Sequence, residues 1–439
     1  APALALLNKT RSIILPSYDQ IIKLSVTMDQ SQSTKRASSI TYDGPKETPT
    51  YAWVILAVIY IASVAAPLSQ SKIPPVMPVL MGAFNLSLAS TGLLMSVFAI
   101  TGFLLALPAG LILQRVGLKV TGLIATGCLV IGSVLGALAA TSGMLLFSRV
   151  VEGVGMGLIA VAAPAAIAMW FPPHKQGTPM GIWATWAPLG STLMFVLAPW
   201  MADTYGWQSI WWFSAAFALL AFMLALVFLR MPSGMPTASL DTNKAAGEKL
   251  LDLKLALANR DIWFLAALFG LFNLALTAIS TYLPTFLTTL RGYTMSSAAF
   301  TASLPMIVVM LFAPLSGILS DKIGSRKALF TWPLLAIAVL LPLPFQVSST
   351  LIPFFMILNG MIVGAVPTAA FSAAPEIMRK PELAGLGLGV ISLGQSLGMF
   401  IGPILFGGLV EQVNWTAASL AMFPFMLAAF FFGRAVQVR

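Results

Sequence analysis

Long apolar runs follow one another through most of this chain, and they limit its fold more than any other feature. From Tyr51 onward each run is about 20 residues long, enough for a helix to cross roughly 30 Å of hydrocarbon. With 58% hydrophobic and 9% charged residues, the chain cannot hide its apolar surface in a water-soluble core. We therefore predict an all-α membrane protein with transmembrane helices over residues 51–80, 90–113, 119–140, 144–168, 178–201, 207–229, 260–286, 295–318, 327–346, 350–372, 383–408 and 413–434.

Polar segments divide these runs into two sets of six. We expect a flexible cytoplasmic tail over residues 1–50, a six-helix bundle over 51–230, and a cytoplasmic linker over 231–259. A second six-helix bundle with a short cytoplasmic tail then covers 260–439.

The basic residues predict how the chain is oriented. Of 24 Lys and Arg residues, all except Lys72, Arg149 and Arg291 fall in segments that lie on one side of the predicted membrane. Because basic loops stay in the cytoplasm, both termini are predicted to be cytoplasmic, in a plasma or inner membrane. The net charge of +10 then faces anionic lipid head groups, so we expect a lipid bilayer and no nucleic acid as partner.

Residue types that carry catalysis or bind metals are scarce. Cys128 and His174 are the single cysteine and the single histidine, which argues against a metal site built from these residues. No paired carboxylates fall in one predicted cleft. We therefore expect neither an enzyme nor a cofactor.

A short motif occurs twice, about 207 residues apart, and each copy lies between two apolar runs. The second copy runs from Gly317 to Lys327 and combines turn glycines with an acid and basic residues. This pattern resembles the loop 2–3 motif of the major facilitator superfamily and its repeat in loop 8–9. The resemblance implies that the motif controls a cytoplasmic gate, and that Gln114 replaces the usual aspartate. The gate residues would be Gly110, Gln114, Arg115 and Gly117 in the first half and Gly317, Asp321, Gly324 and Arg326 in the second.

Other matches at nearly the same spacing indicate that the two halves are repeats. Pro78 matches Pro284, and Gly181 matches Gly389. The resemblance implies two pseudo-symmetric six-helix bundles around a central site, alternating access, and a monomer. The segment Trp170–Gly177 is similar to the anion-transporting branches of the family, which include organic anion, cyanate and nitrate/nitrite carriers.

Charged residues inside the apolar runs are candidates for function, because charge is unfavourable in lipid. Arg149 and Glu152 are three residues apart, so they share a helix face and can pair. Glu152 is either the proton-coupling carboxylate or half of a static ion pair. Lys72, within the predicted first helix, either faces a central cavity and attracts an anionic substrate or extends to the outer head groups. Two cations against one acid favour an anion.

Polar residues in apolar surroundings are weaker candidates. Asn273, Tyr282, Asn359 and Gln395 either contact the substrate or satisfy a neighbouring helix.

The sequence thus predicts a secondary active transporter, coupled to protons, of a small organic anion such as a carboxylate. One alternative is a drug/proton antiporter, in which Glu152 pairs with a lipophilic cation; Lys72 argues against it. The other is a membrane sensor of the same fold that binds its ligand without transporting it.

Overall fold

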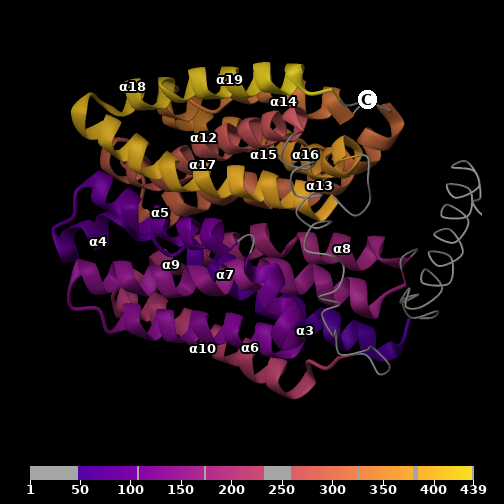
Figure 1. The fold of residues 1–439 in the computed structure, drawn as a ribbon. Coiled ribbons are helices and arrows are strands. Elements are labelled where there is room, and N and C mark those ends of the chain that lie inside the picture. Colours follow the sequence, from indigo (N-terminus) through magenta and orange to yellow (C-terminus); the bar gives the residue numbers. More distant parts are fainter. Residues whose placement is uncertain are drawn as a thin grey trace, which may run out of the picture. The chain divides into compact units, whose positions relative to one another are not determined.

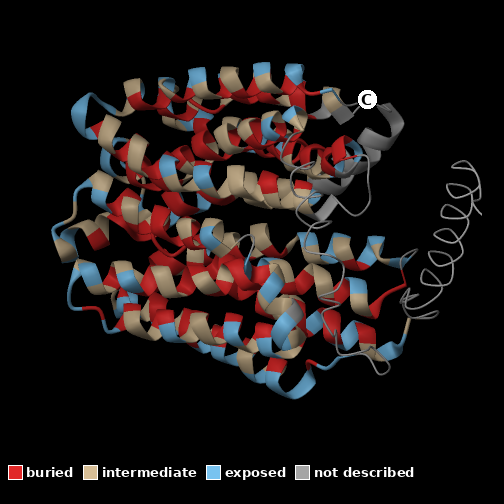
Figure 2. Cartoon of the chain, in the orientation of Figure 1, coloured by how far each residue is buried: buried red, intermediate tan, exposed pale blue. Residues whose placement is uncertain are grey.

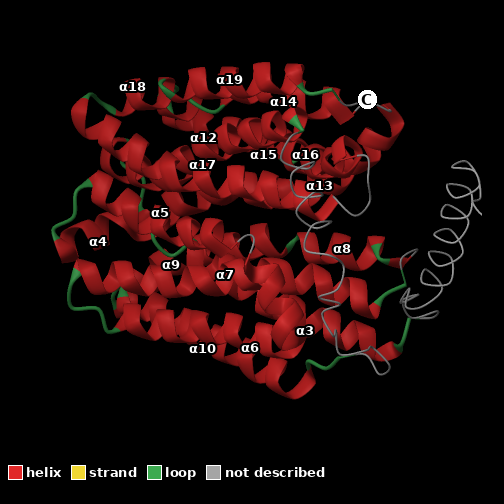
Figure 3. Ribbon diagram, in the orientation of Figure 1, coloured by secondary structure: helices red, strands yellow, loops and turns green. Residues whose placement is uncertain are grey.

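The computed structural model describes residues 48–105, 108–172, 175–231, 259–323, 326–378 and 384–437. Their regular structure is helical (Figure 3). Eleven helices in these ranges are long and apolar enough to cross a membrane, and the apolar helix Phe330–Phe345 is shorter. The predicted all-α membrane fold with twelve spans is therefore confirmed. The predicted tail up to residue 47 and the predicted linker over 232–258 lie outside the described residues.

The first six spans form one bundle, drawn in indigo to pink in Figure 1. A buried core of apolar side chains runs along it (Figure 2). Its elements are α3 (Thr50–Gln70), η1 (Pro74–Val76), α4 (Met77–Phe84), α5 (Leu88–Leu105), α6 (Pro108–Ala137), α7 (Ser142–Trp170), α8 (Gly177–Ala184), α9 (Trp186–Tyr205) and α10 (Gln208–Phe228).

The last six spans form a second bundle, drawn in orange to yellow. Its elements are α12 (Arg260–Leu290), α13 (Met295–Ile323), α14 (Arg326–Leu340), η3 (Leu343–Phe345), η4 (Ser349–Leu351), α15 (Ile352–Val363), α16 (Ala365–Met378), α17 (Ala384–Gln412), α18 (Trp415–Leu420) and α19 (Met422–Ala435).

The helix starts repeat with the spacing of the sequence motif. Helix α13 begins 207 residues after α5, and α18 begins 207 residues after α10. The two bundles meet mainly where α5 packs against α17 and α9 against α13. Because the repeat converts α5 into α13 and α9 into α17, these two contacts are the same contact seen from each half.

Several boundaries differ from the predicted spans. The predicted helix 350–372 is divided at Gly364, and the predicted helix 413–434 is divided at Ala421. The predicted first helix, 51–80, is broken at residues 71–73, so Lys72 lies in a non-helical turn rather than inside a helix. The predicted helix 178–201 is divided at Thr185. Gly117 has φ 80° and ψ 169° and separates a segment that begins at Pro108 from the third span. A side chain at position 117 would be strained at this φ.

Candidate functional site

The break after α3 leaves backbone groups without their helical partners. Pro74 and Pro75 have no N–H group and cannot donate to the carbonyls four residues before them, which includes the carbonyl of Gln70. Arg149 of α7 supplies the missing donors: its Nη2 donates to Gln70 O at 2.9 Å, and its Nη1 donates to Ser69 O at 2.7 Å. The guanidinium therefore caps the C-terminus of α3, where the helix dipole favours a cation.

Glu152 lies at the centre of a group of charged and polar side chains, which we call the Glu152 cluster: Lys72, Ser133, Arg149 and Glu152. Lys72 Nζ donates to Glu152 Oε1 at 2.5 Å, and Arg149 Nη1 donates to Oε2 at 2.6 Å. The hydroxyl of Ser133 donates to Oε1 at 2.7 Å and accepts from Lys72 Nζ at 2.9 Å. Each carboxylate oxygen therefore has a cation as partner, which charge buried in a membrane protein requires.

Aromatic rings and backbone close the Glu152 cluster off from its surroundings. The ammonium of Lys72 lies 5.2 Å from the ring centre of Trp211 on α10, and the guanidinium of Arg149 lies 4.7 Å from that of Phe98 on α5. All four cluster residues are 0% exposed. Five elements of the first bundle therefore enclose two cations and one acid.

The close packing of α6 and α7 at this point depends on a residue without a side chain. A Cβ atom at Gly132 of α6 would lie 2.5 Å from Glu152 Cγ and 2.9 Å from the Ser148 carbonyl oxygen. Glycine at position 132 is therefore what allows Glu152 to lie against the helix that carries Ser133.

The predicted partners Arg149 and Glu152 do pair, as their spacing of three residues indicates. Lys72 binds the same carboxylate and does not extend to the head groups, so that alternative is wrong. Sequence reasoning missed Ser133, Phe98 and Trp211. Serine and aromatic residues are common in apolar helices, and nothing in the sequence distinguishes these three.

The weaker candidates lie apart from the Glu152 cluster. Asn273 donates to Phe269 O within α12, and Asn359 on α15 donates to the carbonyls of Leu340 and Phe355. Gln395 is half-buried on α17.

Tyr282 lies at the contact between the bundles. Its hydroxyl is within hydrogen-bond distance of two carbonyl oxygens, Leu88 O of α5 at 2.7 Å and Pro403 O of α17 at 3.0 Å. Close by, the Glu411 carboxylate of α17 accepts from the N–H of Ala89 at 2.9 Å. These contacts join the N-terminus of α5 to the C-terminal half of α17. Asn414 lies between α17 and α18 at this end of the bundles, which we call the Asn414 end.

The predicted gate residues are only partly described. Gly117 forms the turn given above, Arg115 is exposed, and a Cβ at Gly110 would meet no atom within 4 Å. The side chains of Gln114, Asp321 and Arg326, the surroundings of Gly317, and all of Gly324 lie outside the described structure. The gate role of the motif stays a prediction.

Known proteins with similar sequences are membrane transporters. The hexuronate transporter of Bacillus subtilis is 24% identical over 387 residues, which is 82% of this chain and 88% of that protein. The "Probable sulfoacetate transporter SauU" of Cupriavidus necator is 21% identical over 82% of this chain and 88% of its own length. The multidrug resistance protein MdtG of Enterobacter lignolyticus is 27% identical over 74% of this chain and 77% of its own.

One solved structure shares the fold over nearly its whole length. It is the crystal structure of a bacterial homologue of the human lysosomal transporter Spinster, in an inward-facing and occupied conformation. The TM-score is 0.71 at 17% identity, over 89% of this chain and 98% of that chain.

The sequence pattern of one protein family matches most of this chain. The model of the Major Facilitator Superfamily matches residues 59–378 and 294–438, which together include both bundles. The chain is therefore a multi-pass membrane transporter that belongs to the Major Facilitator Superfamily, and not an enzyme.

Proposed function

We propose that this transporter moves a small organic anion together with protons by alternating access. The observation that carries the proposal is the Glu152 cluster, in which one buried carboxylate is shared by the two cations Lys72 and Arg149. With all three groups ionised, the cluster has a net charge of one positive unit. An anion is the ligand that such a site favours. The names of the hexuronate and sulfoacetate relatives, both small organic acids, agree with this class.

The shared carboxylate also suggests how proton and anion are coupled. A proton bound to Glu152 neutralises the carboxylate and leaves Lys72 and Arg149 without a counter-charge. An anion that enters the cluster then replaces the carboxylate as their partner, so the proton and the anion stabilise each other. Because the cluster is fully buried in this conformation, the anion gains access in another conformation of the cycle.

We infer the orientation from the basic residues. Lys119, Arg230 and Arg434 lie at the end of the bundles opposite Asn414, together with the Gly117 turn. We place this end, and both termini, in the cytoplasm of a cell whose plasma or inner membrane holds the protein as a monomer. The Asn414 end then faces outward.

The proton step is tested with Glu152→Gln in proteoliposomes, with glucuronate as the first substrate probe and other small carboxylates and sulfonates after it. We expect uptake by the natural protein to rise several-fold under an inward acid gradient. In Glu152→Gln this stimulation disappears while anion binding persists, because the amide cannot be ionised. Asp203→Asn, a change of an exposed carboxylate on α9, is the matched control and keeps the stimulation. Unchanged gradient dependence in Glu152→Gln contradicts the proposal.

The anion step is tested with Lys72→Gln, with ligand-induced thermal stabilisation as the readout. We expect stabilisation by the transported anion to be lost, since Lys72 supplies half of the positive charge of the cluster. Lys175→Gln removes an exposed charge between α7 and α8 and should leave the stabilisation intact. Binding without uptake by the natural protein favours a sensor instead.

A drug/proton antiporter is the second candidate, because MdtG is named a multidrug resistance protein. In such a protein Glu152 would bind the organic cation. Here two cations of the protein already hold that carboxylate, so an organic cation would have to displace both. Resistance of a pump-deleted host to cationic dyes would support this candidate.

A further inference from the structure

Arg291 is the basic residue that neither the cytoplasmic loops nor the Glu152 cluster accounts for. It is the C-cap of α12, and its backbone N–H donates to Leu287 O. Gly292 follows with φ 69° and turns the chain away from the helix. The side chain therefore lies at the Asn414 end, where α12 ends.

The guanidinium of Arg291 has weak partners. It lies 5.2 Å from the ring centre of Phe286, and its Nη2 donates to Phe345 O at 3.4 Å, a long hydrogen bond. Its Nε is buried without a hydrogen-bond partner. In the ranges that the structure describes, no carboxylate lies within ion-pair distance of Arg291. This arginine thus has neither a counter-ion nor full hydrogen bonding.

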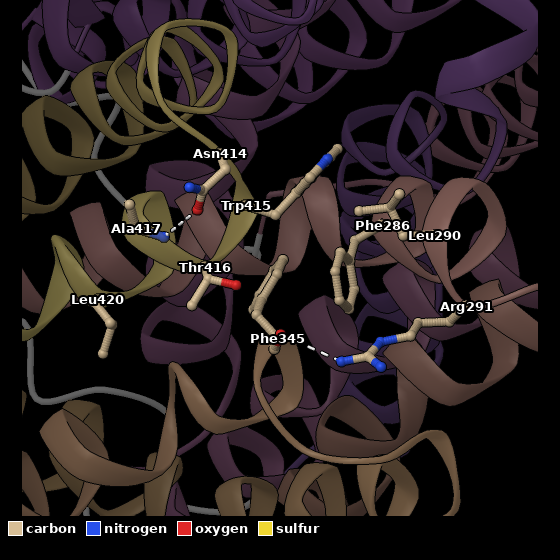
Figure 4. Close-up of a pocket in the computed structure, with 9 residues that line it drawn as sticks. All are labelled: Phe286, Leu290, Arg291, Phe345, Asn414, Trp415, Thr416, Ala417 and Leu420. Atoms are coloured by element: carbon tan, nitrogen blue, oxygen red, sulfur yellow. Dashed lines mark hydrogen bonds between the residues drawn. The ribbon is translucent and has the colours of Figure 1, made fainter.

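A pocket of about 540 Å³ opens beside this guanidinium. Figure 4 shows Arg291 on one side of it and Thr416 and Ala417 of α18 on the other. The rings of Phe286 and Phe345, 4.7 Å apart, lie between them with Trp415. The amide oxygen of Asn414 accepts from the N–H of Ala417 and caps the start of α18 on this side of the pocket.

The rim of the pocket carries exposed apolar side chains. Leu290 and Leu420 line it and are 59% and 48% exposed. Aromatic residues such as Trp415 are typical of the boundary between head groups and hydrocarbon. The volume lies within the range of small-molecule sites, about 300–1,000 Å³.

We propose that this pocket binds the phosphate group of an anionic amphiphile. The phosphate accepts hydrogen bonds from Arg291, and the hydrocarbon part lies along Leu290 and Leu420. Arginine suits this role because its planar fork of donors matches phosphate oxygens. The site lies at the Asn414 end of the second bundle, so it is separate from the Glu152 cluster and does not depend on the transport proposal.

The test uses the full chain, delipidated in detergent, with native mass spectrometry as the readout. Phosphatidylglycerol and phosphatidylcholine are added in parallel series. We expect one saturable phosphatidylglycerol adduct in the natural protein, and in Arg291→Gln its dissociation constant should rise about tenfold, equivalent to about 1.4 kcal/mol. Arg260→Gln is the matched control, because Arg260 begins the same helix and also lies over a ring, 4.5 Å from Phe264. It should bind phosphatidylglycerol as the natural protein does.

A second variant keeps the charge and removes the space. Ala417→Phe fills the pocket from α18 and should lower phosphatidylglycerol binding even with Arg291 in place. Glycerol 3-phosphate added as competitor separates two sources of the phosphate: competition at similar concentrations indicates a soluble phosphate ester, and none indicates a lipid. Equal binding by the natural protein, Arg291→Gln and Ala417→Phe overturns the proposal, and so does equal loss in Arg260→Gln.

Discussion

Ser133 is the one member of the Glu152 cluster that can be replaced without changing the charge of the cluster. Its hydroxyl accepts from Lys72 and donates to Glu152, so one oxygen orders the ammonium and the carboxylate together. When one member of a buried hydrogen-bond network is removed, each polar group that loses its partner destabilises the folded state.

We expect Ser133→Ala to lower the free energy of unfolding by about 1–3 kcal/mol, because both charged partners lose a buried hydrogen bond. Ser214→Ala on α10 is the control. The Ser214 hydroxyl is also buried but bonds only to Ile210 O of its own helix, and its loss should cost at most about 0.5 kcal/mol. Denaturant titration of both variants in the same detergent measures the difference. Equal losses would show that Ser133 does not order the cluster.

At the residue scale, charge in an apolar run identifies Lys72, Arg149 and Glu152 as candidates directly from the sequence. Helical spacing also predicts the pair Arg149–Glu152. The pair Lys72–Glu152 is not predictable in this way, because 80 residues separate its members and their contact depends on how α3, α6 and α7 pack. Ser133 gives no signal in the sequence at all.

At the scale of elements, the break between α3 and η1 is what positions Lys72. The turn at residues 71–73 directs this side chain toward Glu152, and Arg149 satisfies the carbonyls that the break exposes. The break and the Glu152 cluster therefore stabilise each other.

We expect the double change Pro74→Ala with Pro75→Ala to weaken the Glu152 cluster, because the two alanines supply N–H groups that can bond to Gln70 O and Ser71 O and continue α3 through the break. The amides of Lys72 and Ile73, which both proteins share, should exchange more slowly, and transport should fall about tenfold or more as Lys72 turns away from Glu152. Pro78→Ala is the control: Pro78 occupies the first turn of α4, where an N–H has no helical partner. Pro78→Ala should transport within about twofold of the natural protein. Faster exchange of these two amides in the double variant would contradict this account.

The spans were predictable because a helix must be about 20 apolar residues long to cross the hydrocarbon, whatever its neighbours are. Breaks inside spans were harder to predict. Pro74 and Pro75 signal the first one, but α7 runs through Pro164 and α12 through Pro284 without a break. Proline alone therefore does not decide whether a membrane helix ends. At the break after α3, Arg149 of the neighbouring helix α7 bonds to the carbonyls that are left free.

At the scale of the whole molecule, the two bundles are joined by two contacts that the repeat relates, α5 with α17 and α9 with α13. The repeat predicts that such related contacts exist, but not which side chains bond across them. Tyr282 of α12 and Glu411 of α17 bond across the contact between the bundles to backbone groups of α5. Because their partners are backbone groups, no complementary residue in the sequence reveals them.

We expect Tyr282→Phe to favour conformations in which the bundles separate at the Asn414 end. The ring keeps its stack on Phe406 (ring centres 5.3 Å apart), but the hydroxyl that bonds to Leu88 O across the contact between the bundles is lost. A loss of about 1.4 kcal/mol would raise the open population about tenfold.

The readout is maleimide labelling of Thr91→Cys, a buried position on α5, in a background that carries Cys128→Ser. Labelling should accelerate about tenfold with Tyr282→Phe. It should not change with Tyr293→Phe, whose hydroxyl donates to Ser349 O within the second bundle. If both variants label at the natural rate, the Tyr282 hydroxyl does not hold the bundles together. If both label faster, the effect comes from loosening of the second bundle and not from the contact between the two.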